Sequence, residues 1–286
     1  MRLSLALSPK RGRFAPLFFQ GDLVLGLRAA AELGYDGVEL SLASPTEVSP
    51  DVRRSLRELD LGVSAIGTGR VYYDHGVSLL SPRATDREAA IGMVRELVRL
   101  AGDLRCPYVI LGGARGRYSE AGLEDSGAAR ARLLEGLSLL ADEARSAGVK
   151  LLLEPINRYE TDCVNTAAEA LELLDDLGED DAFGILLDTF HMNIEEPDPL
   201  AAVRAAGERL EYVHFADSNR RVAGYGHISF GPVLEAIRQH SRATHVGVEA
   251  LPLPEDREAA AAAARHFRAL LEAVGGGEAL AKGAAS

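Results

Sequence analysis

Short runs of consecutive apolar residues alternate along the whole chain with longer segments in which apolar and polar residues are mixed. The runs are continuous rather than alternating, which is typical of strands buried on both faces of a parallel sheet. Eight runs predict eight strands: Leu3 to Leu7, Gly37 to Leu40, Val63 to Gly67, Tyr108 to Gly112, Lys150 to Glu154, Gly184 to Asp188, Tyr212 to Ala216 and Val246 to Ala250.

The segments between these runs have the apolar spacing of amphipathic helices. Thr85 and Glu88 have the spacing of a capping box, which predicts a helix that starts there, and Thr166 and Glu169 repeat the device. The alanine-rich stretch 257–274 is a strong helix former.

Eight strands, each followed by a helix, predict an α/β protein with a single (β/α)8 TIM barrel over residues 1–274. Residues 275–286 are predicted to form a flexible C-terminal tail. A doubly wound open sheet is the alternative, but no GxGxxG motif follows the first predicted strand. No linker rich in Pro, Gly or Ser divides the chain, which favours one domain over two.

Composition limits the classes of partner. The 286 residues include 31 Lys plus Arg against 43 Asp plus Glu, and the net charge of -12 argues against a nucleic-acid partner. The two cysteines lack CxxC spacing and predict neither a disulfide nor a cysteine zinc site. The apolar run at the N-terminus is too short for a signal peptide or a membrane span. We therefore expect a soluble, cytoplasmic protein without a membrane partner.

Four consecutive predicted strands, the fifth to the eighth, end at or near a side chain that can bind a metal. The four are Glu154, Asp188, His214 and Glu249, at separations of 34, 26 and 35 residues, each close to one βα repeat. Active sites of TIM barrels lie at the C-terminal ends of the strands, so the four side chains could converge. One such carboxylate alone is more often a helix cap or an ion-pair partner. Four in a row favour a site for one divalent ion such as Mn, Co, Mg or Zn.

Further polar residues follow these strand ends, among them Glu160, His191 and Arg220. Each alone could belong to a polar loop, an ion pair or a helix start. Together with a metal they suit an isomerase or epimerase that acts next to a ketone. Two carboxylates could remove and return a proton on opposite faces of a sugar while the cation polarises the carbonyl and the other groups bind oxygens.

The sequence resembles the xylose isomerase-like TIM-barrel superfamily, from GYDGVEL near the second predicted strand to GVEAL in the eighth. Within it, EPINRYE, LLDTFHMNIEE, HFADSNR and GVEA look like the ketose 3-epimerases of the tagatose and psicose type. That resemblance implies a divalent metal, often manganese or cobalt, held by Glu154, Asp188, His214 and Glu249. It implies proton transfer by Glu154 and Glu249, and contacts to substrate oxygens by Glu160, His191 and Arg220.

A closer resemblance is to the bacterial 5-keto-L-gluconate epimerases of inositol breakdown. It rests on MRLSLALS, AIGTG, the RGR segment Arg115 to Arg117, EPINRYETD, DTFHMNIEE, ADSNR and EALPLP. It implies that the substrate is a sugar acid and that the reaction converts 5-keto-L-gluconate to D-tagaturonate. Guanidinium groups suit carboxylates, and several arginines are expected at the same barrel face: Arg70, Arg115, Arg117 and Arg220. After ADSNR the chain departs from that family and has RVAGYGH, so contacts from this loop, including any from His227, do not carry over.

Other activities stay open. A neutral ketose 3-epimerase or an inosose dehydratase would use a similar metal site and similar proton-transfer chemistry. In a hydroxypyruvate isomerase, NRYE after the fifth strand and His214 would be unexpected. An endonuclease IV-like nuclease is remote, because its three-zinc cluster needs histidines where this chain has AIGTG and ILGGARG. A sugar-binding protein without activity is the non-enzymatic alternative. Relatives often form dimers or tetramers, which leaves a homo-oligomer open.

Overall fold

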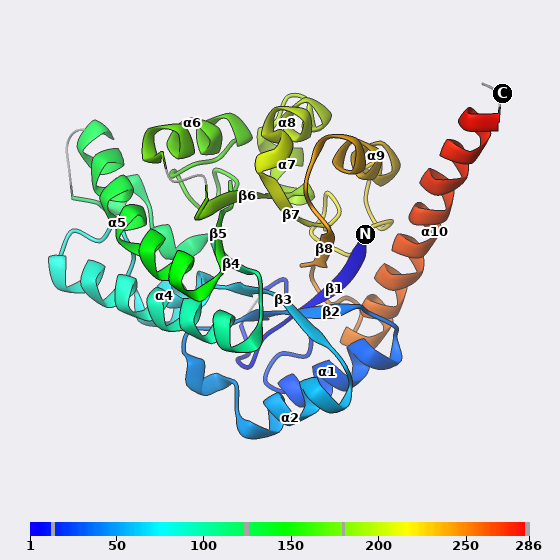
Figure 1. Cartoon of the computed structure of the whole chain (residues 1–286), viewed down its shortest axis with the longest axis horizontal. Helices are drawn as coiled ribbons and strands as arrows, with labels where there is room; N and C mark the ends of the chain where they lie inside the picture. Colours follow the sequence, from blue (N-terminus) through cyan, green and yellow to red (C-terminus); the bar gives the residue numbers. More distant parts are fainter. Residues whose placement is uncertain (13–14, 123–125, 179–180, 284–286) are drawn as a thin grey trace.

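The computed structural model is a closed barrel of parallel strands in the order β1-β2-β3-β4-β5-β6-β7-β8, with helices around it (Figure 1). It describes residues 1–12, 15–122, 126–178 and 181–283. The barrel closes because β8 pairs with β1, with Leu3 opposite Val246 and Leu5 opposite Val248. The predicted (β/α)8 barrel is therefore confirmed, and the alternative of an open doubly wound sheet is wrong.

Every predicted strand is found, and its ends differ from the predicted ones by at most two residues. The continuous apolar runs are explained by burial on both faces, since all residues of β2, β6 and β7 are buried. The strands are β1 (Arg2–Leu7), β2 (Gly37–Ser41), β3 (Gly62–Gly67), β4 (Tyr108–Leu111), β5 (Lys150–Leu153), β6 (Phe183–Asp188), β7 (Leu210–His214) and β8 (His245–Val248).

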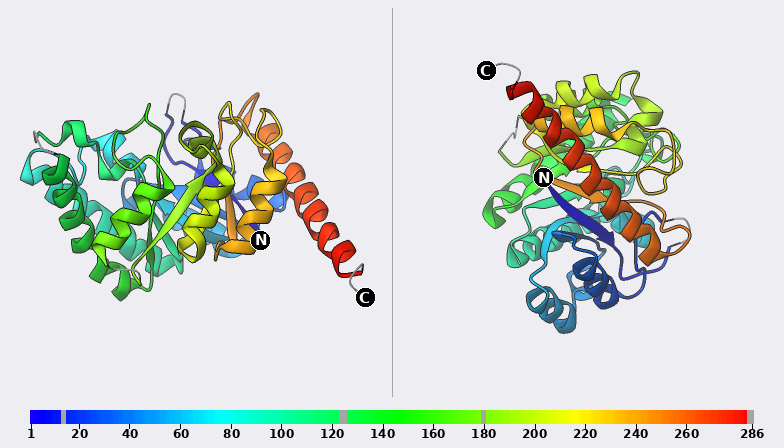
Figure 2. Two further views of the ribbon diagram at one scale, coloured as in Figure 1. Left: turned by 90° about the horizontal axis from the view of Figure 1, so that it is seen from above. Right: turned by 90° about the vertical axis from the view of Figure 1, so that its right-hand side faces the viewer.

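The helices form an outer layer around the strands, which is plain when the two further views are compared (Figure 2). They are α1 (Leu23–Glu32), α2 (Pro50–Glu58), α3 (Gly69–His75), α4 (Ala84–Leu104), α5 (Ser126–Ala147), α6 (Ala167–Leu177), α7 (Thr189–Glu195), α8 (Pro199–Ala206), α9 (Phe230–His240) and α10 (Asp256–Gly283). Shorter 3-10 turns include η2 (Gly113–Arg115) and η3 (Tyr118–Glu120), both between β4 and α5.

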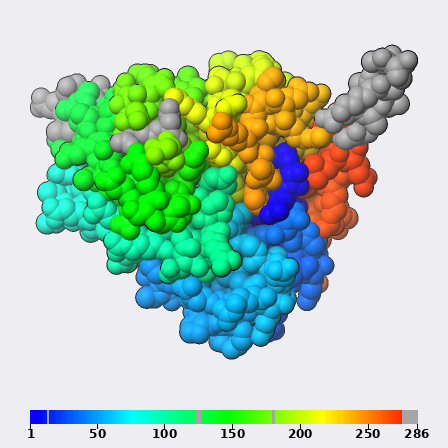
Figure 3. Space-filling model, viewed as in Figure 1, coloured from blue at the N-terminus to red at the C-terminus, as the bar shows by residue number. Residues whose placement is uncertain are grey.

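The last helix contains the predicted helix 257–274 and packs beside β1 at the start of the chain. In Figure 3 the blue N-terminal residues lie between the orange segment that includes β8 and the red residues of α10. The helix continues to Gly283, into the segment 275–286 predicted as a tail. Side chains from 275 onward, and residues 284–286 altogether, lie outside the described part of the chain, so the flexibility of this tail stays a prediction.

The two predicted capping boxes have different outcomes. Thr166 is the N-cap of α6, and its side-chain oxygen accepts a hydrogen bond from the Glu169 amide at 3.2 Å. The Glu169 carboxylate, however, accepts a hydrogen bond from the backbone N–H of Asn165. In a capping box it would accept from the backbone N–H of the N-cap residue, Thr166. The box at Thr85 is wrong: α4 already begins at Ala84, its N-cap is Arg83, and no side chain caps it. Thr85 thus has helical backbone and its oxygen does not reach the free amides of the first turn.

The interior of the barrel contains a small apolar cluster of Ala65, Ile110, Leu152, Leu186 and Tyr212, separate from the larger core between strands and helices. Such layers fill a TIM barrel, so its centre is packed rather than open. The Tyr212 hydroxyl lies 2.9 Å from that of Ser64, which satisfies both buried polar groups. This layer forms the floor on which the C-terminal ends of the strands can present polar groups.

No described helix is long and apolar enough to cross a membrane.

Candidate active site

A cavity of about 490 Å³ lies at the C-terminal ends of the strands, where TIM barrels place their active sites. Its size is within the usual range for a small-molecule site. Six of the residues predicted from the sequence line it: Glu154, Glu160, His191, His214, Arg220 and Glu249.

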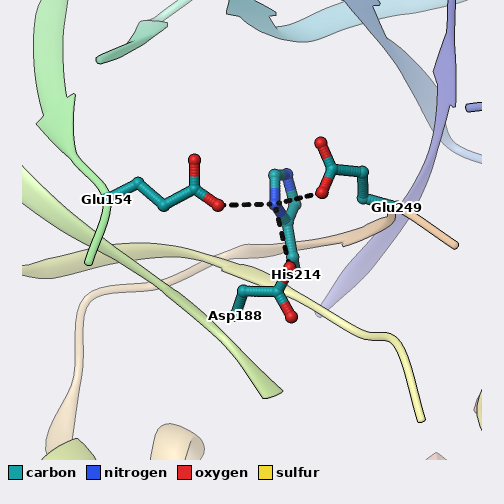
Figure 4. Close-up of side chains that lie close together, drawn as sticks. All are labelled: Glu154, Asp188, His214 and Glu249. Atoms are coloured by element: carbon teal, nitrogen blue, oxygen red, sulfur yellow. Dashed lines mark ion pairs between the residues drawn. The ribbon is translucent and has the colours of Figure 1, made fainter. Parts of the chain in front are cut away.

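The four predicted metal ligands meet at this cavity. Glu154 directly follows β5, Asp188 ends β6, His214 ends β7 and Glu249 directly follows β8. One ligand atom from each lies within 4.8 Å of the others. The His214 Nδ1 atom is 3.6 Å from Glu154, 3.9 Å from Asp188 and 3.7 Å from Glu249. Figure 4 shows the Glu154 and Glu249 carboxylates reaching this nitrogen from opposite sides.

Local structure orients two of these side chains, Asp188 and His214, toward the cluster. Asp188 is the N-cap of α7, so its Oδ1 accepts the Phe190 amide at 2.7 Å and its Oδ2 is left for the site. His214 packs against Gly247, which lies opposite it in β8. A Cβ atom at position 247 would be 2.8 Å from the imidazole Cδ2 atom, so only glycine leaves room for the ring in this place.

The chemistry of this cluster fits a divalent cation. The buried Nδ1 of His214 has no hydrogen-bond partner among the described residues, yet three carboxylates surround it. A buried polar atom without a partner is rare, and a cation would satisfy it and the carboxylates together. Within the described residues, this is the group of His, Cys, Asp and Glu side chains with metal-ligand geometry.

The electrostatics also favour positive charge here. Burial lowers the pKa of His214, but the carboxylates of Glu39, Glu249 and Glu154 outweigh it and raise this pKa well above the ordinary value. Burial raises the pKa of Glu249 to about 8, against the lowering effect of His214 and Arg220, and Glu154 and Asp188 add to the rise. Burial likewise raises the pKa of Asp188. Glu249 and Asp188 therefore bind protons more strongly than ordinary carboxylates unless another cation takes the place of the protons.

Glu39 of β2 is a site residue that the sequence reasoning missed. Its Oε2 lies 2.8 Å from the Nε2 atom of His214, and both side chains are buried. A carboxylate at Nε2 keeps the proton on that nitrogen and leaves the Nδ1 lone pair free for a metal. The signal was present in the sequence, because Glu39 is the one charged residue in the apolar run GVEL.

The predicted substrate-binding residues Glu160, His191 and Arg220 lie around the metal-ligand cluster. Arg220 donates to Asp188 at 2.9 Å and also forms an ion pair with Glu249. It has a φ of +60°, unusual for a residue with a side chain, and its amide and carbonyl bond to Asp217 and Leu251. Burial, with a further contribution from the Arg220 charge, lowers the pKa of His191 well below its ordinary value, so this imidazole is neutral at pH 7.

The structure does not bring Arg115 and Arg117 to this cavity. Arg115 of η2 is buried and donates to the backbone carbonyls of Gly112 and Glu154, at 3.2 and 2.6 Å. Arg117 forms an ion pair with Glu120 at 3.8 Å and borders a separate small hollow. Their predicted contacts to substrate stay predictions, while the geometry gives Arg115 a role in holding the loop that carries Glu154.

Other cavity residues were not singled out from the sequence as substrate-binding residues. Lys10 and Arg11 come from the loop after β1, and Tyr73 of α3 presents an exposed ring. Arg70, which was expected at this face, also lines the cavity, but it forms ion pairs with Glu47 and Asp74, both at 2.6 Å. Loop residues of this kind have no regular spacing, so a single sequence provides little to identify them.

Comparisons with known proteins agree with the site. The family model described as the xylose isomerase-like TIM barrel matches residues 27–270. The L-ribulose 3-epimerase of Mesorhizobium japonicum is 35% identical over 76% of this chain and 72% of that protein. The D-psicose 3-epimerase of Agrobacterium fabrum is 31% identical over 74% and 73%. A solved structure of an L-ribulose 3-epimerase superposes with a TM-score of 0.79 at 25% identity and covers 97% of each chain.

The fold, the cluster of three carboxylates and one imidazole, and these similarities lead to one assignment. This chain belongs to the xylose isomerase-like TIM-barrel family and, within it, is a sugar epimerase of the ketose 3-epimerase family.

Proposed function

We propose that this protein is a divalent-metal-dependent ketose 3-epimerase whose substrate is a neutral ketose. The observation that carries the proposal is the pair of carboxylates, Glu154 and Glu249, on opposite sides of one metal-ligand cluster inside a cavity of sugar size. The relatives named L-ribulose 3-epimerase and D-psicose 3-epimerase support this choice of substrate class.

Glu154, Asp188, His214 and Glu249 would hold the cation, which would polarise the ketone when bound. Each glutamate would also act on one face of the substrate: one removes the proton from the carbon next to the ketone, and the other returns a proton from the opposite side. Glu160, His191 and Arg220 would bind the substrate's oxygens. Because removal and return occur on opposite faces, the configuration at that carbon inverts.

The charges of the cavity support a neutral substrate. The arginines that favoured a sugar acid in the sequence are engaged elsewhere: Arg115 with backbone carbonyls, Arg70 with two carboxylates, and Arg220 with Asp188 and Glu249. Guanidinium groups that are already paired give little affinity for a further carboxylate.

A keto-sugar acid such as 5-keto-L-gluconate is the second candidate. The specific observation in its favour is that Lys10 and Arg11 line the cavity, although Lys10 forms an ion pair with Asp74 at 2.8 Å. A carboxylate at the distal end of a substrate would meet these two side chains.

Deuterium exchange followed by NMR tests both candidates. The protein with manganese is incubated in D2O with ribulose, psicose, fructose and tagatose, and separately with 5-keto-gluconate and tagaturonate. We expect deuterium at carbon 3 and the 3-epimer with the neutral ketoses. Exchange with the keto acids alone would instead establish the second candidate if it is lost in an Arg11→Ala variant. It should be retained in the control Arg54→Ala, an exposed residue of α2. Absence of exchange with every substrate would contradict the proposed function.

A further inference from the structure

We propose that Asn157 is a positioning residue that fixes the neutral His191 imidazole in the tautomer with its proton on Nε2. The ring then presents a hydrogen-bond donor to the cavity. The inference rests on the proposed function only for what accepts this bond, an oxygen of the bound ketose. The tautomer itself is a property of the protein without substrate.

Two groups of Asn157 meet the Nδ1 atom of His191. The side-chain nitrogen Nδ2 lies 2.8 Å from it, and the backbone amide donates to it at 3.4 Å. The backbone N–H can only donate, and the side-chain NH2 group makes the shorter contact, so both favour an Nδ1 that accepts and carries no proton. Both residues are almost completely buried, with 1% and 3% of their surface exposed, so water does not compete with this contact.

The orientation of the Asn157 amide is determined by its other partners. The oxygen Oδ1 accepts the backbone N–H of Tyr159 at 3.0 Å. The nitrogen Nδ2 donates its other proton to the Glu160 carboxylate at 2.8 Å. Exchanging oxygen and nitrogen would place a donor against the Tyr159 amide and an acceptor against a carboxylate. The neighbours therefore leave one orientation, in which Nδ2 faces His191.

The opposite nitrogen of His191, Nε2, faces the reacting centre. It lies 3.8 Å from Glu154 Oε1 and 3.8 Å from Asp188 Oδ2, where a proton on Nε2 is attracted by both carboxylates. A competing donor, Nη1 of Arg220, lies 3.4 Å away, but its shorter bond of 2.9 Å goes to Asp188. Because Nδ1 accepts from Asn157, the ring is not the doubly protonated imidazolium, and its single proton lies on Nε2.

With a cation bound at Nδ1 of His214, both imidazoles of the site would hold a single proton on Nε2, but the two protons would point in different directions. In His214 the Nε2 proton faces Glu39, away from the cluster, and Nδ1 faces the three carboxylates. In His191 the accepting Nδ1 faces Asn157, and Nε2 faces the cavity. One ring can bind a cation and the other can donate to a developing negative charge on the substrate.

The test is 15N NMR of protein labelled at its histidines, loaded with diamagnetic Mg2+ and recorded near pH 7. A His191→Gln sample identifies the signals of this ring. We expect an unprotonated Nδ1 and a protonated Nε2 in the wild type. In Asn157→Asp, whose carboxylate accepts instead of donating, we expect a proton on Nδ1. The control Asn219→Asp, the same chemical change on an exposed loop, should leave the His191 signals unchanged.

A proton on Nδ1 in the wild type would overturn the proposal, and so would unchanged His191 signals in a folded Asn157→Asp protein. If that variant fails to fold, the wild-type spectrum alone decides. For turnover we expect kcat of Asn157→Asp to fall about 100-fold, the loss typical of one donor to a developing oxyanion. The two proposals fail separately, because the spectra need no substrate: a protonated Nε2 without turnover of any ketose would contradict the proposed function alone.

Discussion

At the scale of single residues, the site consists of buried charges that would destabilise the protein unless something offsets them. Asp188 and His214 are each 1% exposed, and Glu154 and Glu249 lie close enough to share one cation with them. Taking like charges out of water costs free energy that a neutral core would not require. A chain that retains such a cluster gains function from it rather than stability.

Replacing Glu154 by Gln removes one proton-transfer group and keeps an oxygen that can bind the metal. We expect kcat to fall about a thousand-fold, within the usual effect of a general acid or base. The metal-free variant should unfold at the same or a higher temperature than the wild type, because one carboxylate of the crowded cluster is gone. Proton exchange in D2O and circular dichroism measure the two effects.

The control for this variant is Glu235→Gln, on the exposed face of α9, which should change neither activity nor stability. A Glu154→Gln protein with wild-type kcat would contradict the assigned proton transfer.

Glu39 provides a second test at this scale, directed at the metal. In Glu39→Ala the Nε2 proton of His214 loses its acceptor, and we expect the dissociation constant for manganese to rise 10- to 100-fold, the usual effect of losing such a partner. Glu39→Gln retains an oxygen that can accept this proton and should weaken binding less. Isothermal titration calorimetry measures both. Equal affinities for the wild type and Glu39→Ala would show that Glu39 does not position the ligand.

The site residues that could be predicted from the sequence share one property: each lies at the C-terminal end of a strand in the βα repeat. Glu154, Asp188, His214 and Glu249 were found because strand ends recur once in each βα unit. Asn157 lacks such a position: its role depends on three partners, two of them near in sequence and the third, His191, in helix α7. Arg115 looked like a substrate contact, but its side chain turns to backbone carbonyls, a choice that depends on three-dimensional packing.

At the scale of elements, strands were predicted more accurately than helix starts, for a physical reason. A strand buried on both faces needs a continuous apolar run, whose ends are visible in the sequence. A helix start depends on which residue first adopts helical backbone, and several nearby residues can cap it. The Thr85 box failed in this way, since α4 begins at Ala84 after Arg83, which pairs with Asp86 at 2.8 Å.

Two matched substitutions test this difference. Thr166→Ala removes the cap of α6 and should lower the free energy of unfolding by about 1 kcal/mol. Thr85→Ala changes an exposed residue inside the first turn of α4 and should alter it by less than about 0.5 kcal/mol. Urea unfolding of both proteins gives the comparison. A larger loss for Thr85→Ala than for Thr166→Ala would contradict the assignment of the caps.

At the scale of the whole molecule, the barrel brings residues that lie far apart in sequence to one point. The ligands come from four neighbouring strands, and Glu39 of β2 reaches His214 of β7 across the barrel interior. This assembly exists only when the barrel is closed, because an open sheet would place β2 and β7 far apart. Metal binding and global folding should therefore be linked.

The linkage gives a prediction for the stability of the whole protein. A ligand that binds only the folded state at a hundred times its dissociation constant adds about 2.7 kcal/mol to the free energy of unfolding. For a chain of this size that corresponds to a rise in the unfolding midpoint of roughly 5 °C. Differential scanning calorimetry with manganese, and then with excess EDTA, measures the rise and its reversal. Asp188→Asn loses one of the buried carboxylates, so its rise should be much smaller at the same manganese concentration. If the mutant and the wild type rose equally, the cation would be stabilising the protein at another place, and the four residues would not be its ligands.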